Sequence, residues 1–412
     1  KMGTRTLLLT TGMLISGVCN TIFNKYQDMT CVEHCDDPKR AKYFEQPVWQ
    51  TFNMFIGETL CYVLVYAILI WEYQAKKYAP LATDGTLTTD SGGITVVEDE
   101  NNEIIKVEEE ELTGRRIYLF WLPTLCDICG TTLMNVGLIY TTASVYQMLR
   151  GAVVLFTGSF SVLFLRRRLY AYHWFSLFLV VLGVSIVGIS GILFPLLSQV
   201  EKKTSVDSFT VMDSNNAHTN KDSTITEASI GVFFVILAQI FVASQFVIEE
   251  KIMERYHVKP LRAVGLEGIF GLSTVGIIAI ILHFAIGIYN PGGYFDISTG
   301  WNQIISFKQI WISGIAICFS IAFFNFFGLS VTKTLSATAR STIDTSRIVL
   351  VWVVSLFLGW ESFSWLQVTG FVILVLGTFI FNNVIKPPPC FTVPPPNIQE
   401  VQPLLSEDHE HM

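Results

Sequence analysis

Charged side chains occur inside long apolar segments of this sequence of 412 residues. Six of them stand out, and they are Glu58, Asp127, Arg150, Glu267, Asp344 and Arg347. Placing a charge in hydrocarbon costs several kcal/mol, so ionisable residues in such segments usually line a cavity or pair with one another. The chemistry that they predict is binding of an ion or a polar solute, or transfer of a proton.

The basic members of this set differ in their surroundings. Asp344 and Arg347 are spaced i, i+3, which puts them on one helical face and predicts an ion pair. This pair can contact a substrate or only hold helices together, and both readings stay open. Arg150 has no acidic residue one turn away, which favours an anionic ligand for its forked guanidinium. The alternative is a partner on another helix, such as Glu58 or Asp127.

Glu58 and Glu267 are the candidate proton carriers. Burial between helices favours the protonated form of a carboxyl group, so such a group can bind and release a proton near neutral pH. The competing interpretation is that each carboxylate is a fixed anchor to Lys25 or Lys251, which close the preceding segments.

Uncharged polar residues in the same segments complete a candidate solute-binding set around Arg150 and Arg347. They are Asn20, Asn24, Asn135, Tyr146, Gln147, Gln239, Gln245 and Asn325. Taken one by one, such residues more often hydrogen-bond between helices than contact a ligand.

Signatures of other functions are missing from the sequence. It contains no His-Glu-x-x-His motif, no phosphate-binding glycine loop with Lys-Ser/Thr and no Gly-x-Ser-x-Gly elbow. No basic groove with interleaved aromatic residues points to nucleic acid. Cys126 and Cys129 lie within one apolar segment, where small-residue packing explains them better than a metal. We therefore expect a protein that is not an enzyme and has no cofactor or metal site.

The elements that must position these residues are membrane-spanning helices. Hydrophobic residues make up 51% of the chain and charged residues 15%, with a mean hydropathy of +0.48. Apolar runs of about 20 residues match the ~30 Å of hydrocarbon that a helix must cross. The ten predicted spans are 6–25, 49–71, 117–140, 144–165, 173–194, 229–249, 264–286, 310–329, 337–359 and 365–385.

The two halves of the chain repeat each other. Arg150 precedes Gly183 by 33 residues, and Arg347 precedes Gly377 by 30 residues, with an apolar run and a short turn between them in both cases. The acidic residues of the second and seventh spans form another matched pair. Five spans per half is an odd number, so the halves must be inverted relative to each other. Secondary transporters have this architecture, with the substrate site at the midplane.

The predicted fold is therefore an all-α integral membrane protein with ten transmembrane helices in two inverted five-helix repeats. The repeats are residues 1–196, which include an acidic cytosolic loop at 72–116, and residues 229–386. A lumenal linker at 197–228 joins them, and 387–412 form a disordered cytosolic tail. Lys and Arg residues divide 17 to 7 between the two sides, which puts both termini in the cytosol. Cys31 and Cys35 share a lumenal loop, either as a disulfide or as free thiols.

Several longer motifs resemble one known family. They are the stretches 144–158, 249–251, 257–268, 322–333, 335–340 and 358–361. Together they are similar to subfamily F of solute carrier family 35, and the similarity covers nearly all ten spans. It implies the drug/metabolite transporter fold with cytosolic termini. Better-known relatives exchange nucleotide sugars for nucleoside monophosphates across Golgi and endoplasmic reticulum membranes, whereas similar members of subfamily F are associated with lysosomal or vacuolar membranes.

The tail contains a sorting pattern. Glu400 lies four residues before the pair Leu404 and Leu405. This is the form of an acidic dileucine signal, which clathrin adaptors read when they route cargo to endosomes and lysosomes. The alternative is a chance match in a tail of low complexity.

The function that these patterns favour is alternating-access transport of a polar or anionic organic solute across an endolysosomal or vacuolar membrane. Proton coupling or exchange would drive it. The alternatives are a Golgi or endoplasmic reticulum nucleotide-sugar antiporter, and a scaffold or receptor that binds partners through the acidic stretch 98–111. The expected partners are a small organic solute, membrane lipid and a clathrin adaptor; the sequence leaves a homodimer open.

Overall fold

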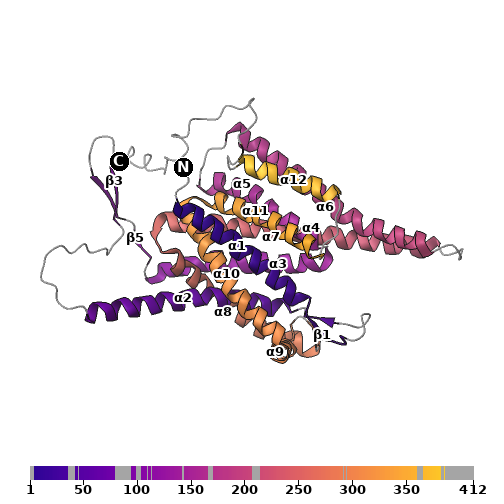
Figure 1. Ribbon diagram of the computed structural model, residues 1–412, viewed down its shortest axis with the longest axis horizontal. Coiled ribbons are helices and arrows are strands. Elements are labelled where there is room, and N and C mark those ends of the chain that lie inside the picture. The colour runs from indigo at the N-terminus through magenta and orange to yellow at the C-terminus, as the bar shows by residue number, and fades with distance from the viewer. Residues whose placement is uncertain are drawn as a thin grey trace.

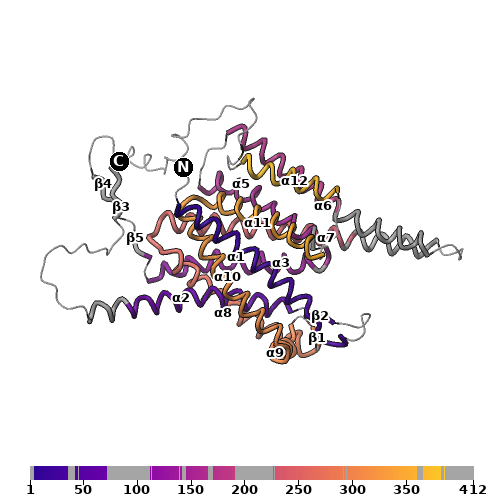
Figure 2. Tube along the Cα trace, viewed as in Figure 1, coloured from indigo at the N-terminus to yellow at the C-terminus, as the bar shows by residue number. Residues whose placement is uncertain are grey.

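The chain folds into a bundle of long helices that lie side by side (Figure 1). The computed structural model describes residues 4–35, 42–44, 46–78, 94–98, 104–108, 110–112, 114–141, 143–165, 170–206, 214–290, 292–293, 295–359, 365–381 and 385. Figure 2 follows the same path as a tube.

Helices of the first half carry the first group of predicted site residues. They are α1 (Thr4–Asp28), α2 (Pro47–Tyr78), α3 (Trp121–Tyr140), α4 (Ala143–Leu149), α5 (Val153–Leu165) and α6 (Ala171–Val206). Two 3-10 segments interrupt the series, η1 (Gly114–Phe120) before α3 and η2 (Arg150–Ala152) between α4 and α5.

Helices of the second half follow after residue 213. They are α7 (Ser214–Arg255), α8 (Pro260–Ala285), the 3-10 turn η3 (Gly287–Tyr289), α9 (Ile297–Ser306), α10 (Lys308–Thr334), α11 (Ala337–Phe357) and α12 (Trp365–Phe381). Six short strands in the described segments form three sheets of two strands each. They pair β1 (Cys31–Glu33) with β2 (Lys42–Tyr43), β3 (Ile94–Glu98) with β4 (Ile104–Glu108), and β5 (Glu110–Glu111) with β6 (Tyr256–His257).

Eight of the described helical segments are long and apolar enough to cross a membrane. They correspond to the first eight predicted spans, the fourth of which consists of α4, η2 and α5. This confirms an all-α integral membrane fold. The last two predicted spans coincide with α11, which carries several charged residues, and with α12, which has 17 residues. A total of ten crossings is consistent with this arrangement and stays a prediction for these two helices.

Two stretches expected to be irregular contain regular structure. Helices α6 and α7 continue into the predicted linker at 197–228, up to Val206 and again from Ser214. The segment 201–206 contains no glycine or proline, so nothing in it ends a helix. In the acidic loop, β3 and β4 form an antiparallel hairpin whose first strand is rich in β-branched residues. The loop between α1 and α2 contains the disulfide Cys31–Cys35, which the sequence left open.

Helix pairing across the two halves follows the predicted repeat. The most extensive contacts are α6 with α12, α3 with α7, α1 with α10, and α2 with α8. The counterparts in the two halves are α1 and α7, α2 and α8, α3 and α10, and α6 and α12. Exchanging each helix for its counterpart turns the α1–α10 pair into the α7–α3 pair. The same exchange leaves the α2–α8 and α6–α12 pairs unchanged. This is the pattern that an in-plane two-fold axis between inverted repeats produces.

Glycines set the close approach of α2 to α8. A Cβ atom on Gly265 would lie 2.7 Å from the backbone of Tyr62, and one on Gly271 would lie 2.1 Å from the ring of Phe55. Residue numbers therefore rise along α8 as they fall along α2, so these two helices are antiparallel. Small residues allow helix backbones to approach in this way, and the two predicted proton carriers lie at this crossing.

Candidate functional site

Four carboxyl side chains and one guanidinium form the acidic cluster in the interior of the bundle. Its members are Glu58 on α2, Asp127 on α3, Glu249 on α7, Glu267 on α8 and Arg340 on α11. They lie close enough to interact electrostatically. Asp127 is half-buried, and the other four have at most 5% of their surface exposed. Five helices thus bring together two predicted proton carriers, one further predicted acid and two residues that the sequence did not indicate.

Only one of the two carboxyl oxygens of Glu58 accepts a hydrogen bond from a described residue. Nδ2 of Asn325 donates a hydrogen bond to its Oε1, and Oε2 is buried with no hydrogen-bond partner among the described residues. Gly268 explains why Glu267 lies nearby, because a Cβ atom there would be 2.6 Å from the carbonyl carbon of Glu58. Oε1 of Glu267 is also buried without a described partner.

Glu249 and Arg340 form a buried ion pair that joins α7 to α11. The Arg340 guanidinium stacks over the ring of Phe246, with Cζ 4.1 Å from the ring centroid. The next residue, Glu250, accepts a hydrogen bond of 3.1 Å from the backbone N–H of Ala337, at the first turn of α11. The end of α7 is therefore fixed to the start of α11 at two points.

Arg340 and Glu249 were missed as site residues. The division of Lys and Arg residues between the two sides of the membrane counted Arg340 on the cytosolic side, but its side chain is 1% exposed. One signal could have found it, because residues 340, 344 and 347 are spaced i, i+4 and i+7 and so share one helical face. Glu249 was taken as the end of a span and as part of the motif 249–251, not as a site residue.

The second group, here called the arginine cluster, consists of Asp344 and Arg347 on α11, Arg150 in η2 and Tyr146 on α4. The predicted ion pair between Asp344 and Arg347 is confirmed, with Nη2 and Oδ1 2.7 Å apart. Arg347 also donates to Oγ1 of Thr21 at 2.8 Å and to the carbonyl of Gly17 at 3.3 Å, which ties α11 to α1. Its guanidinium is therefore held by contacts with two helices, although its Nη2 donates no hydrogen bond to a described residue.

Arg150 is placed differently. It lies in η2, where the fourth span changes from α-helix to 3-10 helix, and it is half-buried. No residue that the structure describes hydrogen-bonds or pairs with its guanidinium. It lies within electrostatic range of Asp344 and Arg347, and Tyr146 lies one turn before it. Neither proposed partner, Glu58 or Asp127, forms an ion pair with it.

The remaining predicted residues divide by what they contact. Asn20 accepts a hydrogen bond of 3.1 Å from Ser320 on α10, so it joins two helices. Gln245 lies beside Glu249, and Asn325 hydrogen-bonds Glu58, so both residues adjoin the acidic cluster. Two others donate to carbonyls of their own helices, Asn24 to that of Asn20 and Gln239 to that of Val235. Asn135 and Gln147 are half-buried on α3 and α4.

The alternative ion pairs of Glu58 and Glu267 with Lys25 or Lys251 are not seen in the part of the chain that the structure describes. Lys25 is half-buried near the end of α1, and Lys251 is exposed on α7. No ion pair joins either lysine to Glu58 or Glu267. The sorting pattern Glu400, Leu404 and Leu405 lies outside the described residues, as the sequence rows show.

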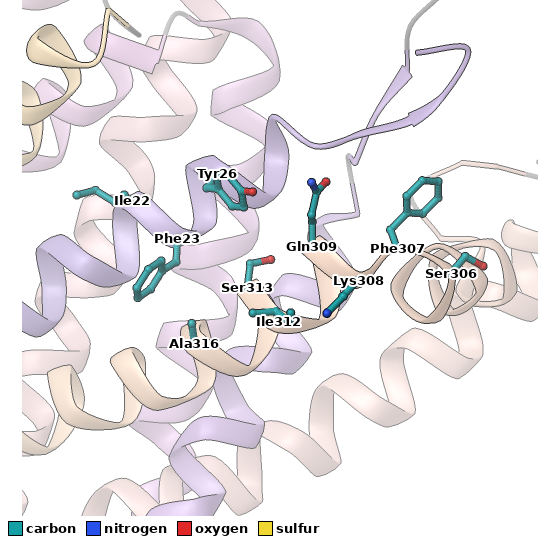
Figure 3. A pocket seen from close by; sticks show the side chains of 10 residues that line it. All are labelled: Ile22, Phe23, Tyr26, Ser306, Phe307, Lys308, Gln309, Ile312, Ser313 and Ala316. Carbon is teal, nitrogen blue, oxygen red and sulfur yellow. The ribbon is translucent and has the colours of Figure 1, made fainter. Parts of the chain in front are cut away.

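A pocket of 690 Å³ lies between the end of α1 and the start of α10 (Figure 3). None of the predicted site residues lines this pocket. Within the described residues no group of three or more His, Cys, Asp or Glu side chains is arranged to hold a metal ion.

Comparisons with known proteins agree with this architecture. Residues 103–189 match the EamA-like transporter family. Solute carrier family 35 member F6 from Homo sapiens is 34% identical over 91% of this chain and 88% of its own length. A Schizosaccharomyces pombe protein described as uncharacterized is 33% identical over 93% of this chain and 99% of its own. One solved structure, titled "Crystal structure of protein", aligns with a TM-score of 0.50 at 9% identity, over 92% of this chain and 97% of the other, and shows the fold alone.

Proposed function

Because the chain belongs to solute carrier family 35, subfamily F, and is a multi-pass membrane solute transporter, we propose that its substrate is a polar or anionic organic solute. Transport proceeds by alternating access, and the membrane is endolysosomal or vacuolar. In the conformation described, most members of the two charged clusters are buried and Asp127 and Arg150 are half-buried, so helices must move to expose the clusters fully.

Arg150 is the observation that carries the choice of an anionic substrate. A half-buried charge with no partner is costly unless a ligand supplies the opposite charge. Its guanidinium offers a planar, permanently charged fork that suits a carboxylate or a phosphate. Interrupted helices at the midplane are where transporters of this kind bind substrate. Asp344 already neutralises Arg347, which leaves Arg150 as the cation that can receive an anion.

The acidic cluster supports proton coupling. Four carboxyl groups face one guanidinium, that of Arg340, so charging all four would leave a buried negative excess. Buried charges without partners are costly, and bound protons remove that cost. Movement of the cluster toward water would release these protons, and this links proton transfer to the conformational cycle. Glu58 and Glu267, each with one buried oxygen that accepts no hydrogen bond from a described residue, are the carriers.

Endolysosomal location rests on the acidic dileucine pattern Glu400, Leu404 and Leu405. A tail variant with Leu404→Ala and Leu405→Ala, followed by fluorescence microscopy, tests it. Redistribution to the cell surface is the expected result, and unchanged lysosomal staining would contradict the proposal.

The solute class is tested by thermal unfolding of purified protein with a panel of anionic, neutral and cationic organic solutes, including nucleotide sugars. A ligand that binds the folded state raises the unfolding midpoint by mass action. We expect stabilisation by anions in the parent protein and none with Arg150→Gln. The control is Lys259→Gln, which removes an exposed positive charge at the start of α8. Anion binding that survives Arg150→Gln would overturn the assignment of this residue.

Deleting residues 84–111 distinguishes a transporter from the alternative, a scaffold or receptor. A transporter keeps solute-dependent stabilisation and uptake without this loop, whereas a scaffold that acts through the acidic stretch loses its partner.

A further inference from the structure

A continuous hollow follows the crossing of α1 and α10; we call it the α1–α10 groove. Its first part is the pocket of 690 Å³ at the end of α1 (Figure 3), and its second part has a volume of 440 Å³. Phe23 and Ala316 line both parts, so the two hollows meet. The groove thus runs along α10 from Lys308 to Phe327.

The groove wall is apolar where it lies within the bilayer. Both α1 and α10 are among the membrane-spanning helices. Ile22 and Phe23 face the groove from α1, and Ile312 and Ala316 from α10. No described side chain fills the space between them. Inside hydrocarbon, an apolar hollow open to the side takes lipid chains, because water gains no hydrogen bonds there.

Polar groups are concentrated at one end of the groove. Lys308, at the first position of α10, and Tyr26, near the end of α1, line that end. Trp301 and Trp311 are exposed at the same end, with 51% and 42% of their surfaces accessible. Tryptophan and tyrosine mark the level of lipid headgroups. Lys308 therefore lies at headgroup depth, and no described carboxylate forms an ion pair with it.

We propose that the α1–α10 groove is a binding site for a phospholipid with an anionic headgroup. The ammonium of Lys308 binds the phosphate and headgroup, and one acyl chain lies between Phe23 and Ala316. Lys308 and Ala316 are eight residues apart, or about 12 Å along a helix. That distance is most of the ~15 Å of one leaflet's hydrocarbon, so an acyl chain fits the first hollow along its length. The site does not depend on which solute is transported.

The test is lipid titration of the full-length protein in detergent, followed by native mass spectrometry, with phosphatidylglycerol and phosphatidylcholine of the same chains. We expect the parent to prefer phosphatidylglycerol. Lys308→Gln should weaken the binding of phosphatidylglycerol by about fivefold, which is the effect of one lysine near an anionic lipid. The binding of phosphatidylcholine should be unchanged. Lys42→Gln, an exposed lysine paired with Glu33 on the neighbouring loop, should keep the preference.

A second variant tests the acyl-chain half of the site. Ala316→Phe adds a ring where the two hollows meet and should lower binding of both lipids. Should this variant fail to fold, a photoreactive phosphatidylglycerol on the parent protein replaces it, with labelled peptides from α1 and α10 expected. An unchanged lipid preference in Lys308→Gln, labelling confined to other helices, or saturation by soluble glycerol phosphate would each overturn the proposal. The last result would indicate a site for free anions.

Discussion

Nδ2 of Asn325 on α10 donates a hydrogen bond of 2.5 Å to Oε1 of Glu58 on α2. This bond orients the carboxyl group and leaves Oε2, which is buried without a partner among the described residues, as the oxygen that can hold a proton. Asn325 therefore positions the group on which the proposed coupling depends.

Replacing Glu58 with Gln tests that coupling. The amide oxygen of Gln can still accept the bond from Asn325, so Glu58→Gln should fold with a nearly unchanged unfolding midpoint. It cannot bind a proton, so proton movement driven by the anion from the solute panel should disappear. An internal pH dye in proteoliposomes measures this. Glu33→Gln, which changes an exposed carboxylate outside the bundle, is the matched control. Equal proton flux in Glu58→Gln and the parent would exclude this residue as a carrier.

Close packing at the α2–α8 crossing predicts a sharp difference between two glycines of one helix. A Cβ atom on Gly268 would lie 2.4 Å from the backbone nitrogen of Thr59, whereas one on Gly276 would meet Phe52 at an ordinary 3.6 Å. Gly268→Ala should therefore destabilise the protein by about 1–3 kcal/mol through overpacking. Gly276→Ala should be neutral or stabilising, because alanine favours the helix. Thermal unfolding in detergent compares them, and equal midpoints would show that the helices separate easily.

The Glu249–Arg340 pair predicts strong coupling in a double-mutant cycle. Arg340→Met leaves a buried carboxylate without its partner and should cost about 3–5 kcal/mol. Adding Glu249→Gln removes that uncompensated charge and should recover a large part of the loss. Unfolding free energies of the parent, the two single variants and the double variant give the coupling. Additive effects would mean that the two residues do not stabilise α7 against α11 through their charges.

Asp296 predicts how the corner between α8 and α10 responds to acid. Hydrogen bonds from the N–H of Gly292 and the hydroxyls of Thr299 and Ser298 hold the pKa of Asp296 well below its usual range. A lowered pKa in the folded state gives stability that is present above the unfolded pKa of about 3.9 and is lost only as pH falls through the folded pKa. The cap on α9 should therefore persist throughout the range from pH 7 to pH 5.

Hydrogen exchange of the α9 amides measures this cap. Protection, corrected for intrinsic rates, should be equal at pH 7 and pH 5 in the parent. Asp296→Ala should lower it by about fivefold at both values, as expected for loss of a helix cap worth ~1 kcal/mol. Asp296→Asn, which keeps an acceptor, should lie between them. A parent cap that opens between pH 7 and pH 5 would contradict the lowered pKa.

The parts of this structure that follow from local sequence were predictable. The first eight spans were predictable, because a helix must be apolar over about 20 residues to cross hydrocarbon. The Asp344–Arg347 ion pair was also predictable, because i, i+3 spacing puts the two side chains on one face of the helix. An odd number of spans in each half predicts that the halves are inverted, and the observed helix pairing is consistent with this expectation.

Contacts between distant helices were not predictable in this way. Arg340 and Glu249 are 91 residues apart in sequence, and only the packing of α11 against α7 brings them together. Several serines and threonines surround Arg340 in sequence, which made it resemble a surface residue. The lysine anchors failed for a related reason, because the position of a residue at the end of a span does not determine which neighbouring helix its side chain meets.

The most direct test of the central claim is counterflow of a radiolabelled organic anion, selected by the solute panel, in proteoliposomes of matched protein content. Parent protein and Lys259→Gln should exchange it at equal rates. Arg150→Gln should fold with an unchanged midpoint and lose exchange by at least about tenfold, which corresponds to ~1.4 kcal/mol of lost binding. Full exchange by well-folded Arg150→Gln would contradict the proposal that this guanidinium, which pairs with no described residue, binds the transported anion.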